Sequence, residues 1–273
     1  SRRNSMESTT GVQSVSVRPT PAIAPPDFAH PLQAGLRVLG SKGFGGSRDM
    51  KRTTSPPLYA DRNDAARALL RMLEEFKGAD PLVLAIPRGG VPIGAIIANG
   101  LGGQLDTVLV HKLRASSAPE FAIGAIDERG DCTMAAQHAV LAIASAEVDR
   151  EKNLQLQRLR EQRLAYAQIR SRIDRTDRPV IVVDDGLATG LTMIAALKNI
   201  RRSHPRQLIA AVPVASPAGR DAVRSYADRL ICPLIAEDFY SVGQFYRDFL
   251  PVSDEEALAL LKTAGGGLHP IAA

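Results

Sequence analysis

The chain has 273 residues, of which 45% are hydrophobic, 23% charged and 4% aromatic, and it contains no tryptophan. These values exclude collagen-like, fully disordered and coiled-coil classes, and so few aromatic rings disfavour a stacking platform for nucleic acid. No run approaches the roughly 20 apolar residues that cross a bilayer, so we expect no membrane span. Cys132 and Cys232 have no CxxC or histidine partner nearby. We therefore expect no disulfide scaffold, no zinc site and a cytoplasmic protein.

The formal net charge of +5 comes from the amino-terminal segment. Residues 1–60 hold eight Lys or Arg and three Asp or Glu, which leaves 26 basic and 26 acidic residues in the rest of the chain. Sequence-independent binding to DNA needs clustered cations on the folded body. Because that body is neutral, we expect no nucleic-acid partner.

In chain order, residues 1–57 come first, and their Ser-, Thr- and Pro-rich composition predicts a disordered tail or a leader segment. A folded region follows over 58–265, and 266–273 form a second tail. The predicted strands are 81–86, 105–110, 121–127, 178–185, 207–214 and 229–236, and the predicted helices are 61–78, 91–103, 146–174, 191–203, 218–227 and 253–265. This alternation predicts one α/β domain, an open, mostly parallel sheet flanked by helices, with a small hood at 237–251.

Segment 180–192, VIVVDDGLATGLT, ends a buried strand with Asp184 and Asp185 and continues through a glycine-containing loop into a helix. In parallel sheets, ligands bind beyond the carboxyl ends of the strands. Two adjacent carboxylates repel a phosphate, but they can hold two neighbouring hydroxyl groups or a Mg²⁺ ion. The loop amides can form a nest for an anion at the helix N-terminus, with hydroxyl donors from Thr189 and Thr192. The amides concerned are those of Leu187, Ala188, Thr189 and Gly190.

This combination predicts a site for a sugar phosphate with vicinal hydroxyls. The alternative is a strand that ends in an acidic, glycine-containing turn without a ligand. We favour the binding site because the thirteen-residue combination is much more specific than a glycine loop alone.

The same segment resembles the motif with which type I phosphoribosyltransferases bind phosphoribosyl pyrophosphate (PRPP): four aliphatic residues, two acids, two variable residues, a small residue, Thr, Gly, a variable residue and Thr. The resemblance implies that Asp184 and Asp185 hold the ribose 2′- and 3′-hydroxyls, and Mg²⁺ indirectly through those hydroxyls or water. It implies that 187–190 and Thr192 hold the 5′-phosphate. The wider pattern, from Leu58 to about residue 261, is similar to a bacterial group of predicted phosphoribosyltransferases. We therefore interpret 58–265 as a phosphoribosyltransferase domain.

Segment 86–93, IPRGGVPI, places Arg88, Gly89 and Gly90 between a predicted strand and a helix. Paired glycines let backbone amides approach a ligand, and the Arg88 guanidinium can bind phosphate with two hydrogen bonds. The same residues are also common in turns. Beside the first motif, the segment resembles the family's pyrophosphate loop, which implies that Arg88 contacts pyrophosphate.

Segment 108–126 carries His111 and Lys112 at a strand end, before a loop of small residues. It resembles the mobile loop of the family, in which a lysine at the place of Lys112 stabilises the departing pyrophosphate. His111 stands where the family has arginine, and we interpret it as a surface residue at a strand end.

The carboxy-terminal segment concentrates aromatic rings that can either stack on a flat base or pack the hood. These residues are Phe239, Tyr240, Phe245 and Tyr246. Enzymes for hypoxanthine, guanine or xanthine place an aspartate where this chain has Ala188, which argues against a standard 6-oxopurine substrate. The charged helix 146–174 is interpreted as a solvated face with ion pairs four residues apart.

Together, the resemblance implies an enzyme of nucleotide metabolism that transfers the 5-phosphoribosyl group from PRPP to a nitrogen acceptor and releases pyrophosphate. The implied partners are PRPP, Mg²⁺ as cofactor and an acceptor base that the sequence does not identify. A homodimer is the expected assembly. The alternative is a regulatory protein that senses PRPP or a nucleotide in the same pocket without catalysis.

Overall fold

The structure is a computed structural model that describes residues 58–116, 118–135, 143–169 and 171–264. The two predicted tails, 1–57 and 266–273, lie outside the described residues. None of the helices in the described part of the chain is long and apolar enough to cross a membrane.

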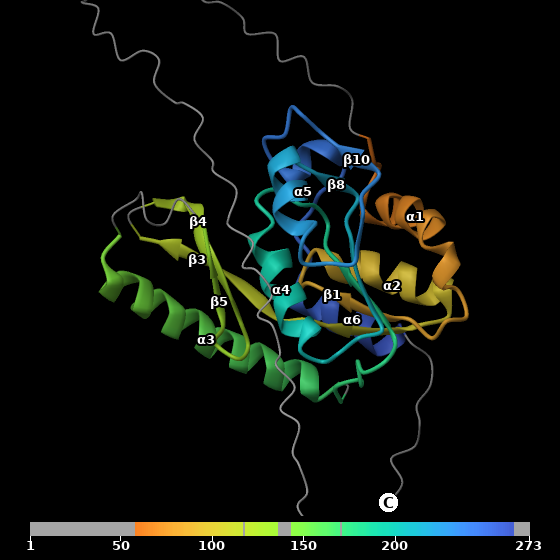
Figure 1. The fold of residues 1–273 in the computed structure, drawn as a ribbon, viewed down its shortest axis with the longest axis horizontal. Coiled ribbons are helices and arrows are strands. Elements are labelled where there is room, and N and C mark those ends of the chain that lie inside the picture. Colours follow the sequence, from red (N-terminus) through yellow and green to blue (C-terminus); the bar gives the residue numbers. More distant parts are fainter. Residues whose placement is uncertain (1–57, 117, 136–142, 170, 265–273) are drawn as a thin grey trace, which may run out of the picture. The chain divides into compact units, whose positions relative to one another are not determined.

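The main sheet has five parallel strands in the order β2-β1-β6-β7-β9, which confirms the predicted open parallel sheet (Figure 1). The central strands β1 and β6 are buried at every position, as continuous apolar runs predict. The strands are β1 (Leu82–Ala85), β2 (Gln104–Thr107), β6 (Pro179–Val183), β7 (Gln207–Ala211) and β9 (Arg229–Ile231).

Helices cover both faces of this sheet. Val83 and Ile181 belong to one core cluster with side chains of α1, α2 and α6, whereas Leu84 and Val182 pack against α4 on the other face. Successive strand residues point to opposite faces, so each strand contributes to both clusters. The helices are α1 (Arg62–Met72), α2 (Gly90–Leu101), α4 (Leu191–Arg201), α5 (Pro217–Val223) and α6 (Asp254–Thr263).

Helix α1 begins where the sequence predicts and ends earlier than predicted. Asp61 caps the helix by accepting a hydrogen bond from the Asp64 amide at 2.8 Å. The helix ends at Met72 rather than at Gly78, and a short 3₁₀ turn over Glu74–Phe76 follows. Met72, the last residue of the helix, is 47% exposed.

A second, antiparallel sheet was not predicted. It contains β3 (Val110–Ala115), β4 (Ala118–Asp127) and β5 (Cys132–Met134). The run 105–110 therefore does not form one strand: it begins in β2 and ends in β3, which belong to different sheets. Figure 1 shows the long helix α3 (Ser145–Ala167) lying along these strands. The prediction that α3 continues to residue 174 was wrong, because the chain leaves the helix after Ala167.

Two predicted strands near the carboxyl end are each divided into two. The run 207–214 forms β7 and then β8 (Val214–Ala215), and the run 229–236 forms β9 and then β10 (Leu234–Ile235). Pro213 and Pro233 lie at the two breaks, where a residue without an amide proton cannot continue the ladder. Strands β8 and β10 pair with each other beside the 3₁₀-helix Val242–Phe245.

A buried polar contact joins the antiparallel sheet to α4. Asn199 of α4 is 3% exposed and donates a hydrogen bond at 2.7 Å to the Asp127 carboxylate, which is 1% exposed. The Asp127 carboxylate also accepts from the amides of Arg129 and Asp131. Removing a partner of a buried charged group leaves its desolvation uncompensated, so this contact fixes how the two sheets meet.

We predict that Asn199→Leu lowers the free energy of unfolding by about 1–3 kcal/mol, because the Asp127 carboxylate loses a donor without a large change in side-chain volume. Urea denaturation measures the change. The matched control is Asn153→Leu on the exposed side of α3, for which we expect a change within about 0.5 kcal/mol. Equal losses in the two variants would contradict the role given to this hydrogen bond.

Candidate active site

A cavity of about 520 Å³ opens at the carboxyl ends of β1 and β6. Its lining includes the acids and the loop that follow β6, the loop that follows β1, and side chains of β3 and α3. This is the edge of a parallel sheet at which ligands are expected to bind. The structure thus brings the three separate sequence segments to one place.

Asp184 and Asp185 line this cavity together. The Asp185 amide donates to Asp184 Oδ1 at 2.9 Å, which holds the first carboxylate beside the second. Burial raises the pKa of Asp184 well above its ordinary value, and the neighbouring charge of Asp185 raises it further. Burial also raises the pKa of Asp185, against the opposing charge of Arg62. Two adjacent desolvated carboxyls of this kind are typical of functional sites.

Arg62, which the sequence analysis missed, is the main ionic partner of the acid pair. Its Nε and Nη2 donate to Asp185 Oδ2 at 3.1 and 2.9 Å. The guanidinium lies 3.9 Å from the centre of the Phe249 ring, and its Nη1 donates to the Leu250 carbonyl at 2.8 Å. One feature of the sequence could have indicated it. Arg62 is the first residue of α1, where a cation is unfavourable because it opposes the helix dipole, so an ionic partner elsewhere was to be expected.

The glycines after β1 allow the chain to approach the acids closely. A Cβ at Gly89 would collide with the Asp185 carboxylate, and a Cβ at Gly90 would lie 2.6 Å from the Val183 carbonyl oxygen. Gly89 lines the cavity, whereas Gly90 is the first residue of α2. Arg88 points elsewhere: it is half exposed, and its Nη1 lies 3.4 Å from Asp254 of α6.

The loop after the acids provides fewer free amides than the sequence suggested. The Leu187 amide donates to the Val214 carbonyl at 2.9 Å and is therefore not available to a ligand. Among the described residues, no acceptor is bonded to the amides of Ala188, Thr189 and Gly190. Gly190 has φ +79°, a left-handed conformation that favours glycine, and α4 begins directly after it. Three amides thus remain for an anion at this helix N-terminus.

The cavity lining also contains a cation and two hydroxyl groups. Lys112 of β3 is exposed to the cavity, and Thr189 and Thr192 line it as well. The His111 ring is half-buried between two glutamines of α3: Nδ1 lies 3.0 Å from Gln155 Oε1 and Nε2 lies 3.2 Å from Gln162 Oε1. The ring therefore attaches the β3–β4 hairpin to α3. We had expected only a surface residue at a strand end.

The aromatic residues of the hood pack against protein. Tyr246 is buried and donates through its hydroxyl to the Asp185 carbonyl at 2.6 Å. Phe239 and Phe245 pair with their ring centres 5.3 Å apart, and Tyr240 is 88% exposed. None of these four lines the cavity, whose hood residue is Val242. Phe239, Phe245 and Tyr246 therefore pack the hood, whereas the exposed Tyr240 neither packs nor lines the cavity.

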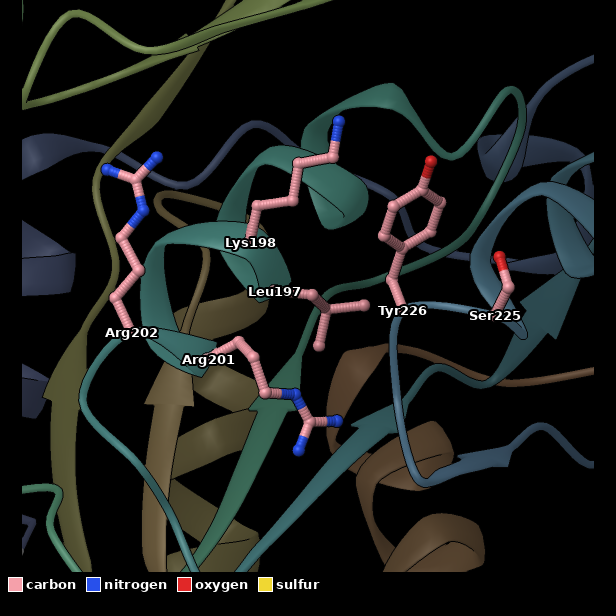
Figure 2. A pocket seen from close by; sticks show the side chains of 6 residues that line it. All are labelled: Leu197, Lys198, Arg201, Arg202, Ser225 and Tyr226. Carbon is pink, nitrogen blue, oxygen red and sulfur yellow. The ribbon is translucent and has the colours of Figure 1, made fainter. Parts of the chain in front are cut away.

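A second hollow, of about 490 Å³, lies between α4 and the segment after α5 (Figure 2). Figure 2 shows its cationic side chains pointing in different directions. Arg201 is paired with Asp228 at 2.7 Å and Arg202 with Asp131 at 2.5 Å. The two arginines are thus paired with carboxylates, Lys198 lies 5.1 Å from the Tyr226 ring, and the cations do not converge, so we assign no binding role to this hollow.

The acid pair and the free loop amides lie together at the carboxyl edge of a parallel sheet, which is where such sheets bind ligands. The family model of the phosphoribosyl transferase domain matches residues 58–250, and the chain belongs to this family. It is 37% identical over 212 residues to Rv0571c of Mycobacterium tuberculosis, which is provisionally named a phosphoribosyl transferase. That match covers 76% of this chain and 47% of the relative, so the chain spans about half the length of that curated protein.

A solved structure gives the same picture of the fold. The crystal structure of TT1426 from Thermus thermophilus matches with a TM-score of 0.64 and 37% sequence identity. The match covers 76% of this chain and 99% of that chain.

We predict that Asp184→Asn increases the free energy of unfolding at neutral pH. Because the pKa of Asp184 is raised in the folded state, the wild type loses stability as the pH rises from the ordinary value of 3.8 through the folded value. The amide cannot ionise, so the variant escapes this loss, which amounts to about 1.4 kcal/mol for each pH unit between the two pKa values.

Chemical denaturation at a series of pH values tests this prediction. The gain should shrink as the pH falls towards 3.8. Asp238→Asn, on an exposed side chain of the hood, serves as the control and should show no comparable gain. A variant that is less stable than the wild type throughout the range would contradict the burial of this charge.

Proposed function

We propose that the protein transfers the 5-phosphoribosyl group of PRPP to a nitrogen acceptor, a nucleobase, and releases pyrophosphate. The observation that carries this proposal is the joint presence, in one cavity, of two adjacent carboxyls and a loop of free amides. Membership of the phosphoribosyl transferase family supports PRPP as the donor. Ala188 argues against a 6-oxopurine as the base.

In this proposal the acid pair binds the sugar. A ribose presents two neighbouring hydroxyl donors, and Asp184 and Asp185 are adjacent acceptors that line the same cavity. Hydrogen bonds from hydroxyl groups favour the ionised carboxylates, so ligand binding offsets the cost of their burial. Arg62 keeps Asp185 oriented towards the cavity through its two hydrogen bonds.

The loop after the acids binds the 5′-phosphate. The amides of Ala188, Thr189 and Gly190 and the hydroxyl of Thr192 are the proposed donors, and the N-terminus of α4 adds a favourable dipole. Leu187 contributes its side chain to the cavity wall while its amide holds the loop to β8. Ser216 supports the loop from outside by donating to the Ala188 carbonyl at 2.5 Å.

The reaction itself needs positioning and charge stabilisation. The C1–O bond to pyrophosphate breaks with its electron pair going to the pyrophosphate oxygen, through an oxocarbenium-like state. The lone pair of the acceptor nitrogen then forms the C1–N bond, and the nitrogen gives up its proton to solvent. Lys112 lines the same cavity as the acids and stabilises the departing charge. Because Gly89 has no side chain, the loop after β1 lies directly against the Asp185 carboxylate. This close approach positions the sugar relative to the leaving group.

Mg²⁺ is the expected cofactor. Among the described residues there is no group of three or more His, Cys, Asp or Glu side chains that could enclose a metal ion. Two carboxylates together with substrate oxygens are a usual environment for this ion, so Asp184 and Asp185 fit it as indirect ligands. When bound, the ion would neutralise charge on the pyrophosphate. A cytoplasmic location and a homodimer stay predictions of the sequence.

We predict that the double variant Asp184→Asn and Asp185→Asn abolishes PRPP binding and leaves the fold intact, because amides are weaker acceptors for the two sugar hydroxyls. Isothermal titration with PRPP and MgCl₂ measures the affinity, and thermal melting verifies the fold. Asp238→Asn is the control and should bind as the wild type does. Unchanged PRPP affinity in the double variant would remove the sugar-site assignment.

Pyrophosphate release from PRPP across a panel of bases separates catalysis from sensing. An enzyme releases pyrophosphate with at least one base. Binding of PRPP without turnover on any base would favour the regulatory alternative.

A further inference from the structure

Helix α3 was expected to be a solvated face, yet one of its sides belongs to the cavity. Gln155 and Gln162 bind the two nitrogens of the His111 ring. Nearer the N-terminus of the same helix, Glu147 accepts a hydrogen bond from the Ser116 amide and Glu151 accepts one from the Arg114 amide. The helix is therefore attached to the hairpin that carries Lys112 along much of its length.

Arg158 lies between the two glutamines on this side of the helix. At 100° per residue, it is about 60° from Gln155 and about 40° from Gln162, so all three share one face. Both Gln155 and Arg158 line the cavity with Lys112. The helix thus presents a guanidinium to the site that holds the acid pair.

The Arg158 guanidinium has no partner in the described part of the chain: no ion pair and no hydrogen bond involves it. The contrast with Arg88 is informative, since Arg88 was expected to bind pyrophosphate but points towards Asp254. Around the cavity, Asp185 is paired with Arg62, whereas no carboxylate among the described residues is bonded to Lys112 or Arg158. Unpaired cations at a cavity wall provide charge for an anionic ligand.

We propose that Arg158 binds the pyrophosphate group of PRPP, together with Lys112, and stabilises it as it leaves. This inference rests on the proposed function, because it assigns one part of the same substrate. As the C1–O bond breaks, the electron pair moves to the bridging oxygen and negative charge increases on the pyrophosphate. The guanidinium of Arg158, exposed on this helix, can stabilise this charge by donating two parallel hydrogen bonds. The clamped His111 ring positions the helix and the hairpin that carry the two cations.

The test compares three probes on Arg158→Ala: PRPP, inorganic pyrophosphate, and ribose 5-phosphate, which lacks the leaving group. With MgCl₂ present, isothermal titration should show PRPP and pyrophosphate affinities reduced by roughly 10- to 100-fold, as expected for a lost charge-assisted hydrogen bond. Ribose 5-phosphate affinity should stay unchanged. Arg158→Lys should recover part of the loss, because it keeps the charge without the planar geometry.

The matched control is Arg160→Ala. Arg160 is exposed on the same helix but is rotated by about 200° from Arg158, so it should leave all three affinities unchanged. This inference would be overturned if Arg158→Ala bound pyrophosphate and PRPP with unchanged affinity. It would also be overturned if the affinity for ribose 5-phosphate fell by the same factor as the other two affinities. Failure of the wild type itself to bind PRPP and ribose 5-phosphate would instead overturn the proposed function.

Discussion

Two adjacent carboxyl groups are held out of bulk water at the end of β6, and much of the surrounding structure accommodates them. Asp184 and Asp185 both have raised pKa values because they are buried, a cost that a protein tolerates only where the groups are paired or functional. Arg62 supplies the compensating charge at 2.9 Å. The absence of a side chain at Gly89 leaves room for the Asp185 carboxylate. The Tyr246 hydroxyl donates a hydrogen bond to the backbone carbonyl of Asp185.

This constraint connects the first and last parts of the folded region. The Tyr59 amide donates to the Phe245 carbonyl, and the Arg247 amide donates to the Tyr59 carbonyl, each at 2.9 Å. Arg62 follows directly after this pairing and reaches Leu250 as well as the acids. The segment that precedes the first helix and the hood are therefore one structural unit, and its charged end lies at the candidate active site. A change in the hood can therefore affect Asp185 through Arg62 without itself lining the cavity.

Sequence reasoning found what local patterns encode. The buried strand before Asp184 is a continuous apolar run, and the loop after it carries glycine where φ is positive, so both were readable. Pro213, which has no amide proton, signals the break between β7 and β8. The continuous apolar run around it nevertheless led us to predict a single strand. The antiparallel sheet was not predicted, although its strands are consecutive in the chain, because the small residues after Lys112 were interpreted as a loop and instead continue β3 and begin β4. Arg62 and Arg158 reach the site through packing of whole helices, and α3 is polar on nearly all sides, which hides its buried face.

The most direct test of the account is a crystal structure of the protein with ribose 5-phosphate. The account predicts the phosphate on the amides of 188–190 and the 2′- and 3′-hydroxyls on the carboxylates of Asp184 and Asp185. Crystals in which this loop binds no phosphate, or in which both acids face away from the sugar, would contradict it.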